Sequence, residues 1–101
     1  NFKMAYLVNI ETLDDLSEIY SQDLSISQAI AMSILDNLNT TRRWVPALEI
    51  YISNSDKTFN YSVDRQSFIP VLEKCLKVHE IKEDYETCHT INKAIQKLKK
   101  Q

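Results

Sequence analysis

The chain of 101 residues contains no glycine. Phosphate-binding loops and dinucleotide-binding turns need backbone geometry that only glycine supplies, so these nucleotide-binding motifs are excluded. Cysteine is also scarce, with two residues in the chain. Two cysteines are too few for a small secreted scaffold held together by disulfide bonds, so this class of protein is excluded. No apolar run approaches the roughly 20 residues that cross a bilayer. We therefore expect no membrane span.

Composition and length indicate a folded protein of one domain. Hydrophobic residues make up 44% of the chain and charged residues 26%, with a formal net charge of −2, and these values are typical of a globular protein rather than a disordered one. A chain of this length has room for one core. No charged and then apolar leader indicates export. We expect a single cytoplasmic domain over residues 1–101 that uses no cofactor.

The first half of the chain predicts two helices within residues 12–39. Apolar residues recur at three- and four-residue spacing in Thr12–Gln22, which is typical of an amphipathic helix. Ser25 and Gln28 then have the spacing of a capping box ahead of a second apolar-periodic run. This second helix is expected to end near Asn39-Thr40-Thr41.

Residues 47–63 predict a β-hairpin, because apolar and polar residues alternate on both sides of a polar turn. The alternating apolar residues are Leu48, Ile50, Ile52, Phe59, Tyr61 and Val63. A hairpin alone is marginally stable in water, so it must pack against helices or against a further strand. The apolar run Met4–Ile10 fits either that third strand or the lead-in to a helix.

Residues 67–99 predict two antiparallel helices joined by a turn at Lys82–Asp84. Pro70 suits the opening turn of the first helix, where a backbone donor is not needed, and Asp64 or Ser67 supplies the cap. The two apolar faces comprise Phe68, Ile69, Leu72, Leu76 and His79, and then Tyr85, Cys88, Ile91, Ile95 and Leu98. Together with the preceding elements, this pair predicts a helix-dominated α+β fold.

The C-terminal helices also share a spacing with a known contact module. The residues concerned are Leu72-Glu73-Lys74, Leu76-Lys77, Tyr85-Glu86-x-Cys88, Ile91, Ile95 and Leu98. Over residues 72–98 this spacing resembles the UVR-type helical hairpin of bacterial excision-repair subunits and some stress regulators. The resemblance implies a helical hairpin that contacts another protein. Family members usually have two alanines where Cys88-His89 stands and an Arg-Asp pair where Asn92-Lys93 stands, and these departures alter the contact surface.

Two cysteines and two histidines in this region invite the hypothesis of a metal site or a nucleophile. Cys75 and His79 are four residues apart on one helix, and Cys88 and His89 begin the next. Zinc prefers four tetrahedral ligands, but Cys88 and His89 project about 100° apart, so only three of these residues can converge. No oxyanion hole or orienting group accompanies a cysteine nucleophile. We therefore expect core and seam positions here, with neither a metal nor catalysis.

Residues 12–63 are predicted to form a helix, a short turn, a second helix and a hairpin, in this order. The second helix opens at Leu24-Ser25-Ile26-Ser27-Gln28-Ala29. This order resembles the winged-helix family of DNA-binding proteins, which implies a recognition helix in the major groove and a hairpin wing. The residues that would then face bases are Ser27, Gln28, Met32 and Ser33, and those that would reach phosphates are Arg42, Arg43, Lys57 and Arg65. The second helix, however, has no lysine or arginine to neutralise phosphate.

Arg42, Arg43 and Trp44 stand between the second helix and the hairpin, and Tyr51 occupies a polar-facing position of the hairpin. Arginine, tryptophan and tyrosine are enriched at binding hot spots, so these four are the candidate partner-binding residues. The favoured structural interpretation has Trp44 closing the end of the core, while Arg42 and Arg43 bond the carbonyls that end the helix.

Charge is distributed unevenly along the chain. Residues 1–41 carry one base and six acids, whereas the last nine residues carry four lysines and no acid. Either segment can steer a charged partner, and both also complement the dipoles of the helices in which we expect them to lie. The sequence leaves open which of the two is a working surface.

These observations predict a small non-enzymatic regulator or inhibitor that acts by occupying a protein partner, of the type found among phage and plasmid accessory, immunity and antitoxin proteins. A winged-helix transcription regulator that binds DNA is the alternative. An exposed aromatic patch on the hairpin would favour the first, and a contiguous basic face would favour the second. A twofold homodimer is a further expectation, because small amphipathic domains often bury surplus apolar surface against a second copy.

Overall fold

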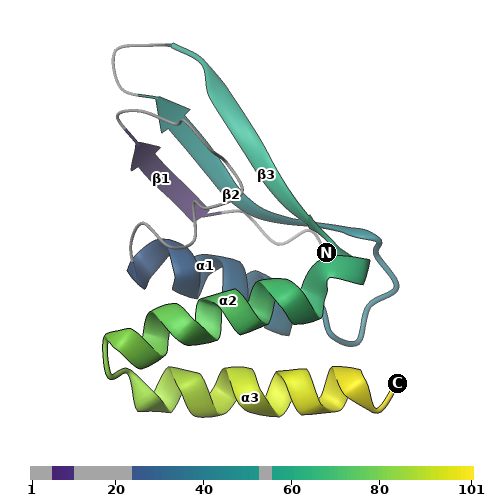
Figure 1. Cartoon of the computed structure of the whole chain (residues 1–101). Helices are drawn as coiled ribbons and strands as arrows, with labels where there is room; N and C mark the ends of the chain where they lie inside the picture. The colour runs from purple at the N-terminus through teal and green to yellow at the C-terminus, as the bar shows by residue number, and fades with distance from the viewer. Residues whose placement is uncertain (1–5, 11–23, 53–55) are drawn as a thin grey trace.

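The computed structural model describes residues 6–10, 24–52 and 56–101 and shows an α+β fold (Figure 1). Its elements are β1 (Tyr6–Ile10), α1 (Leu24–Leu35), β2 (Trp44–Ile52), β3 (Thr58–Asp64), the short 3-10 helix η2 (Arg65–Ser67), α2 (Phe68–Ile81) and α3 (Tyr85–Lys99). The predicted class, the β-hairpin and the C-terminal pair of helices are confirmed. The helix predicted over Thr12–Gln22 lies outside the described residues. None of the described helices is long and apolar enough to cross a membrane.

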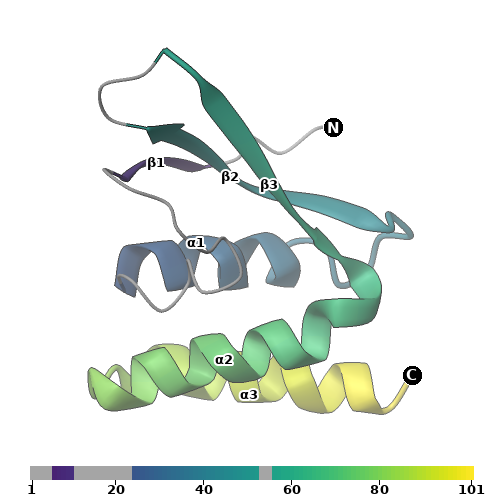
Figure 2. The same ribbon diagram turned by 45° about the horizontal axis from the view of Figure 1, so that its top comes forward.

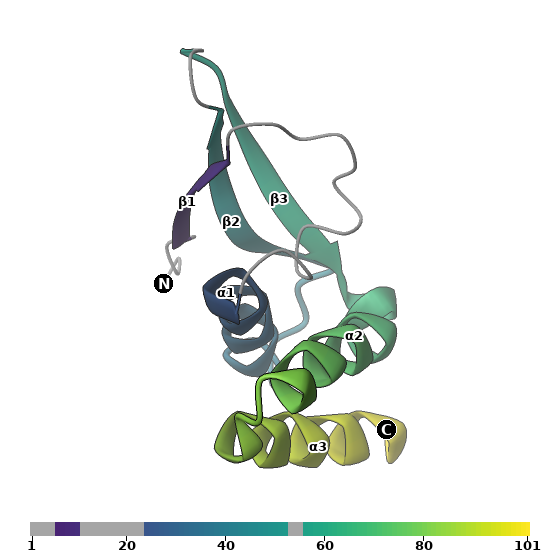
Figure 3. The ribbon, with the colours of Figure 1, turned by 60° about the vertical axis from the view of Figure 1, so that its left-hand side comes forward.

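The strands form one sheet in the order β1-β2-β3. β1 lies parallel to β2, with Tyr6 opposite Leu48, and β3 lies antiparallel to β2, with Val63 opposite Val45. A strand is therefore the correct alternative for the N-terminal apolar run. α1 packs against the sheet, and the α2–α3 hairpin packs against α1, with α3 farthest from the sheet (Figures 1, 2 and 3).

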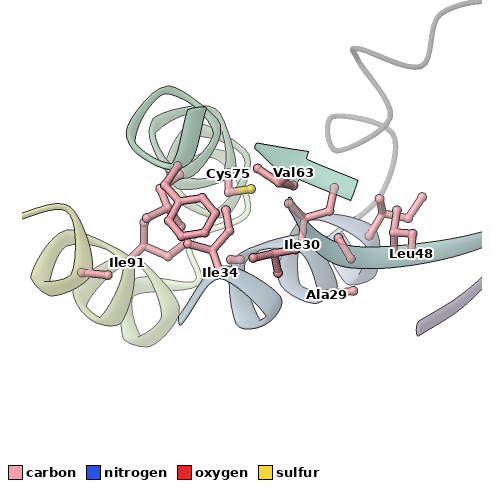
Figure 4. Packing of buried hydrophobic residues seen from close by; sticks show 14 of the residues in the cluster. Ala29, Ile30, Ile34, Leu48, Val63, Cys75 and Ile91 are labelled. Atoms are coloured by element: carbon pink, nitrogen blue, oxygen red, sulfur yellow. The ribbon is translucent and has the colours of Figure 1, made fainter. Parts of the chain in front are cut away.

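α1 is the central helix of the core, because it packs against both β2 and the helical hairpin. Ile30 and Ile34 are fully buried and lie among side chains from β2, β3, α2 and α3 (Figure 4). Each such isoleucine contributes on the order of 1.5–3 kcal/mol through burial. Four further buried residues are small and let both neighbours approach the helix closely: Ser27, Ala29, Ala31 and Ser33.

The ends of α1 differ in detail from the sequence prediction. The helix begins at Leu24, so Ser25 lies inside the first turn and not in front of the helix as a capping residue. Hydrogen-bonded turns follow its last residue and continue to the amide of Thr40, which donates to the carbonyl of Asn37 at 3.2 Å. The side chain of Asn37 donates to the carbonyl of Ser33 at 2.8 Å, which satisfies one of the unpaired carbonyls at the helix end.

β2 begins at Trp44, three residues before the predicted start of the hairpin. The register with β3 shifts between Pro46 and Leu48, so Ala47 is an extra residue that forms a β-bulge. Proline lacks the backbone donor of a regular ladder, and bulges are among the few places where a sheet tolerates it. Beyond the bulge the predicted alternation is confirmed on β2, where Leu48 and Ile50 are both fully buried, but Phe59 of β3, predicted on the same apolar face, is 43% exposed.

α2 and α3 form the predicted antiparallel hairpin. Their buried residues are Phe68, Leu72, Cys75, His79, Cys88, Ile91, Ala94 and Ile95. The prediction was wrong for Tyr85, which is 67% exposed. Tyr85 is the first residue of α3 and lies beside the connecting turn, and the buried face of the helix begins one turn later at Cys88.

The turn between α2 and α3 places a glutamate where helices usually end with glycine. Glu83 has a φ of 59°. Its amide donates to the carbonyl of Glu80 at 3.0 Å, and the amide of Asp84 donates to the carbonyl of His79 at 2.9 Å. This pair of bonds is a Schellman motif. A residue with a side chain costs about 1–2 kcal/mol in the left-handed conformation that the motif requires.

Replacing Glu83 by glycine is expected to raise the free energy of unfolding by about 1 kcal/mol. Glycine adopts the left-handed conformation without the steric cost of a side chain, but it also increases the entropy of the unfolded chain, which offsets part of this stabilisation. Equilibrium urea unfolding measures this change. Lys82→Gly is the matched control: Lys82 has a φ of −85°, so glycine there is expected to destabilise the protein. Equal effects of the two substitutions would contradict a strained turn at Glu83.

Candidate functional site

The bulge in β2 decides which face of the sheet carries the candidate residues. Side chains alternate along a strand, so Trp44 and Tyr51, seven positions apart, would lie on opposite faces of a regular strand. The extra residue Ala47 reverses the alternation. Val45 and Ile50 are buried in the core, and Trp44 and Tyr51 are both exposed. The two aromatic side chains therefore share the outer face of β2, away from the helices.

Trp44 lies at the start of β2 with 55% of its surface exposed. The guanidinium carbon of Arg43 lies 5.7 Å from the centre of the indole ring, a cation–π contact worth about 0.5–1 kcal/mol at an exposed site. Arg43 Nη2 also lies 3.5 Å from Asp64 Oδ2, a surface ion pair in which the Arg43 side chain is 65% exposed. The interpretation that Trp44 closes the core is wrong, because the neighbouring Val45 fills that end of the core instead.

Arg65, the first residue of η2, fastens the connection between α1 and β2. Its Nη2 donates to the carbonyl of Asn37 at 2.9 Å and to Thr40 Oγ1 at 2.8 Å. Its Nε donates to the carbonyl of Arg42 at 2.6 Å. The guanidinium also lies over Phe68, with its carbon 4.8 Å from the ring centre. One side chain therefore joins the end of α1, the start of β2 and the first residue of α2.

The sequence assigns Arg42 and Arg43 to the carbonyls at the end of α1, but the structure places Arg65 on the carbonyl of Asn37. Arg65 follows β3, and the antiparallel hairpin brings the end of β3 back beside the start of β2. The hydrogen bond from Arg65 to Asn37 therefore joins residues 28 positions apart, and no local spacing in the sequence predicts it.

The four basic residues of the DNA-binding alternative do not gather on one face. Arg65 holds the loop, and Arg43 pairs with Asp64. Lys57 precedes β3 at the other end of the hairpin, roughly 26 Å along the strands from Arg43. Arg42 is exposed beside Arg43.

The residues expected to face bases are also divided between the core and the surface. Ser27 is fully buried and Ser33 is 4% exposed. Ser33 donates its hydroxyl to the carbonyl of Ala29 at 2.9 Å. Gln28 is exposed and Met32 is half-buried. Because α1 is covered by the sheet and by α2, only part of the predicted recognition face is open to solvent.

Cys75 and Cys88 are free thiols buried in the seam between α2 and α3. Burial raises the pKa of both thiols, and the nearby charges of Glu80 and Asp84 raise the pKa of Cys88 further. A raised pKa keeps a thiol protonated near neutral pH, which is the opposite of what activates a cysteine nucleophile. The chemistry of these positions is therefore that of core residues.

His79 is fully buried at the end of α2, and its Nδ1 lies 2.9 Å from Asp84 Oδ2. Asp84 caps α3 by accepting a hydrogen bond from the amide of Thr87 at 3.4 Å. The bonds from Thr87 and His79 lower the pKa of Asp84. The other ring nitrogen, Nε2, is buried with no hydrogen-bond partner in the described part of the chain. Within the same part, no three histidine, cysteine or acidic residues are grouped to hold a metal ion.

No protein-family model matches this chain, and neither a curated protein nor a solved structure is similar to it. The residues of functional interest are therefore the ones that the fold itself brings together on the surface. These are Trp44 and Tyr51 on the outer face of β2, with Arg43 and Asp64 beside the indole.

Arg65→Ala is expected to lower the free energy of unfolding by about 1–3 kcal/mol, because it removes three hydrogen bonds from a charged donor at a partly exposed site. Arg65→Lys should recover only part of this loss, since lysine lacks the planar fork that reaches several acceptors. Urea unfolding measures both variants, with Gln66→Ala as a control at the exposed neighbouring position. Wild-type stability of Arg65→Ala would rule out the fastening role.

Asp84 is expected to make folding sensitive to acid. Its pKa is lower in the folded protein than in the unfolded chain, so its contribution to stability is complete above the unfolded pKa and is lost as the pH falls through the folded pKa. Thermal unfolding between pH 5 and about pH 2.5 should therefore show a smaller loss of stability for Asp84→Asn than for the wild type. Glu83→Gln, a neighbouring exposed carboxylate, is the control and should follow the wild type.

Proposed function

We propose that this protein is a non-enzymatic binding module that acts by occupying a protein partner through the outer face of its sheet. The observation that carries the proposal is the exposed Trp44, held at the start of β2 by Arg43 and Asp64. Tryptophan and arginine are the residue types most enriched at binding hot spots. The two side chains already contact each other in the free protein, and such contacts reduce the entropy lost on binding.

Tyr51 extends the proposed surface along the same strand. It is 37% exposed and lies roughly 20 Å from Trp44 on the same face. A standard protein interface covers about 800 Å² on each partner, which is wide enough to include both aromatic residues. The half-buried Pro46 and Glu49 lie between them on β2. The surface therefore has two aromatic anchors on one strand, and the candidate residues Arg42 and Arg43 lie at one end of it.

Of the four basic residues that the DNA-binding alternative needs, Lys57 is separated from the other three, and this supports protein binding over DNA binding. DNA affinity depends largely on several cations that meet the phosphates together, and Lys57 lies at the opposite end of the hairpin from Arg43. A winged-helix DNA regulator remains the alternative outcome of the experiment below.

Trp44→Ala is expected to weaken binding of the partner at least tenfold, and Tyr51→Ala to weaken it less, because Trp44 is the larger and more exposed anchor. The partner is recovered from host lysate on the immobilised protein, identified by mass spectrometry and titrated as a pure component. Tyr85→Ala is the matched control, since Tyr85 is a similarly exposed aromatic residue at the far turn of the helical hairpin.

Two results would count against the proposal. Equal binding by Trp44→Ala and Tyr85→Ala would remove Trp44 from the interface. Binding of mixed-sequence duplex DNA at micromolar or lower Kd, weakening steeply from about 50 to 200 mM salt, would instead support the winged-helix alternative. Circular dichroism on each variant separates a loss of binding from a loss of folding.

A further inference from the structure

One end of the molecule collects positive charge from two segments that are far apart in the sequence. We call it the basic end and define it as residues 36–44 and 93–101. These residues contain six bases and one acid, whereas the rest of the chain contains six bases and thirteen acids. The protein as a whole is weakly acidic, with a formal net charge of −2, so the positive charge is concentrated locally.

Hydrogen bonds show that the two segments are neighbours. Lys97 Nζ on α3 donates to Asn39 Oδ1 in the loop after α1 at 3.2 Å. The same loop is fastened by Arg65 at Asn37 and leads directly into Trp44. The ribbon shows the C-terminal end of α3 and the connection from α1 to β2 on the same side of the molecule (Figures 1 and 2). Lys97 of α3 therefore lies beside the loop that leads to the proposed hot spot.

The exposed face of α3 has a shallow, open depression that begins one turn before the basic end, and its lining in the described part of the chain contains no carboxylate. Its lining residues are His89, Asn92, Lys93, Gln96, Lys97 and Lys100. Lys93, Lys97 and Lys100 follow one face of the helix over about 10 Å. Amide side chains lie between the ammonium groups and can both donate and accept hydrogen bonds. This surface is complementary to carboxylates placed one helical turn or a few residues apart.

We propose that the basic end binds an acidic segment of the protein partner, with the carboxylates on Lys93, Lys97 and Lys100 and an apolar side chain of the partner on Trp44. This inference rests on the proposed function and adds the chemistry of the partner to it. A short acidic segment fits this surface because all of its carboxylates can lie within the basic end. A nucleic acid is a longer polyanion, and it would extend past the basic end over a chain that is otherwise strongly acidic.

The test uses a synthetic 12-residue peptide rich in glutamate with a central leucine, labelled for fluorescence anisotropy. Trp44 is the only tryptophan, so a change in its emission on adding unlabelled peptide reports binding beside it. The expected result is saturable binding that weakens at least tenfold from 50 to 200 mM salt and changes the tryptophan emission. A lysine-rich peptide of the same length should not bind.

The triple variant Lys93→Gln, Lys97→Gln and Lys100→Gln is expected to weaken peptide binding at least tenfold. Its matched control, Lys74→Gln, Lys77→Gln and Lys82→Gln, removes the same charge from exposed positions on α2 and the following turn and should stay within twofold of the wild type. Equal losses in the two triple variants would show a nonspecific charge effect and overturn the inference. Tighter binding of a 20-base-pair duplex than of the peptide would overturn it in favour of nucleic acid.

Failure of this inference is distinguishable from failure of the proposed function. If the lysine variant keeps full affinity for the lysate partner while Trp44→Ala loses it, the protein-binding function stands and the acidic segment is wrong. If Trp44→Ala keeps full affinity for that partner, the proposed function itself is wrong, whatever the peptide does.

Discussion

The rest of the structure depends on how closely α1 can approach two neighbours at once. Side chains at the contact set the distance between packed elements, and α1 has serine or alanine at four of its buried positions. A three-stranded sheet and a two-helix hairpin each have too little apolar surface to be stable alone. Ile30 and Ile34 connect them, because both are fully buried among residues of the sheet and of the hairpin. Larger residues at the small positions would separate these two halves.

Local periodicity in the sequence predicts most of the architecture. The alternation around Leu48 and Ile50 identifies the hairpin, and the spacing of Cys88, Ile91 and Ile95 identifies the buried face of α3. These signals suffice because a strand or helix that is buried on one side must repeat with its own period. The run at Tyr6–Ile10 is too short for periodicity to decide, and only its pairing with β2 makes it a strand.

The candidate site was harder to predict, because it depends on contacts that cross the fold. The sequence interpretation has Trp44 closing the end of the core, whereas the structure places it on the surface, and the extra residue Ala47 puts it on the same face as Tyr51. Arg65 lies in no recognisable motif, yet it holds the loop that carries Arg42. The neighbourhood of Lys97 and Asn39 likewise follows from tertiary packing alone. The residue types of the site could be read from the sequence, and their shared location could not.

The parallel pairing of β1 with β2 has a consequence for the order of folding. Tyr6 and Leu48 are separated by the whole of α1, whereas the β2–β3 hairpin and the α2–α3 pair join close neighbours in the chain. Closing a longer loop costs more entropy, and contacts between distant residues slow folding. We therefore expect β1 to join the sheet last, after α1 has reached its place against β2. Until then one edge of the central strand is unpaired, and this transient edge is where newly made chains are most prone to associate wrongly.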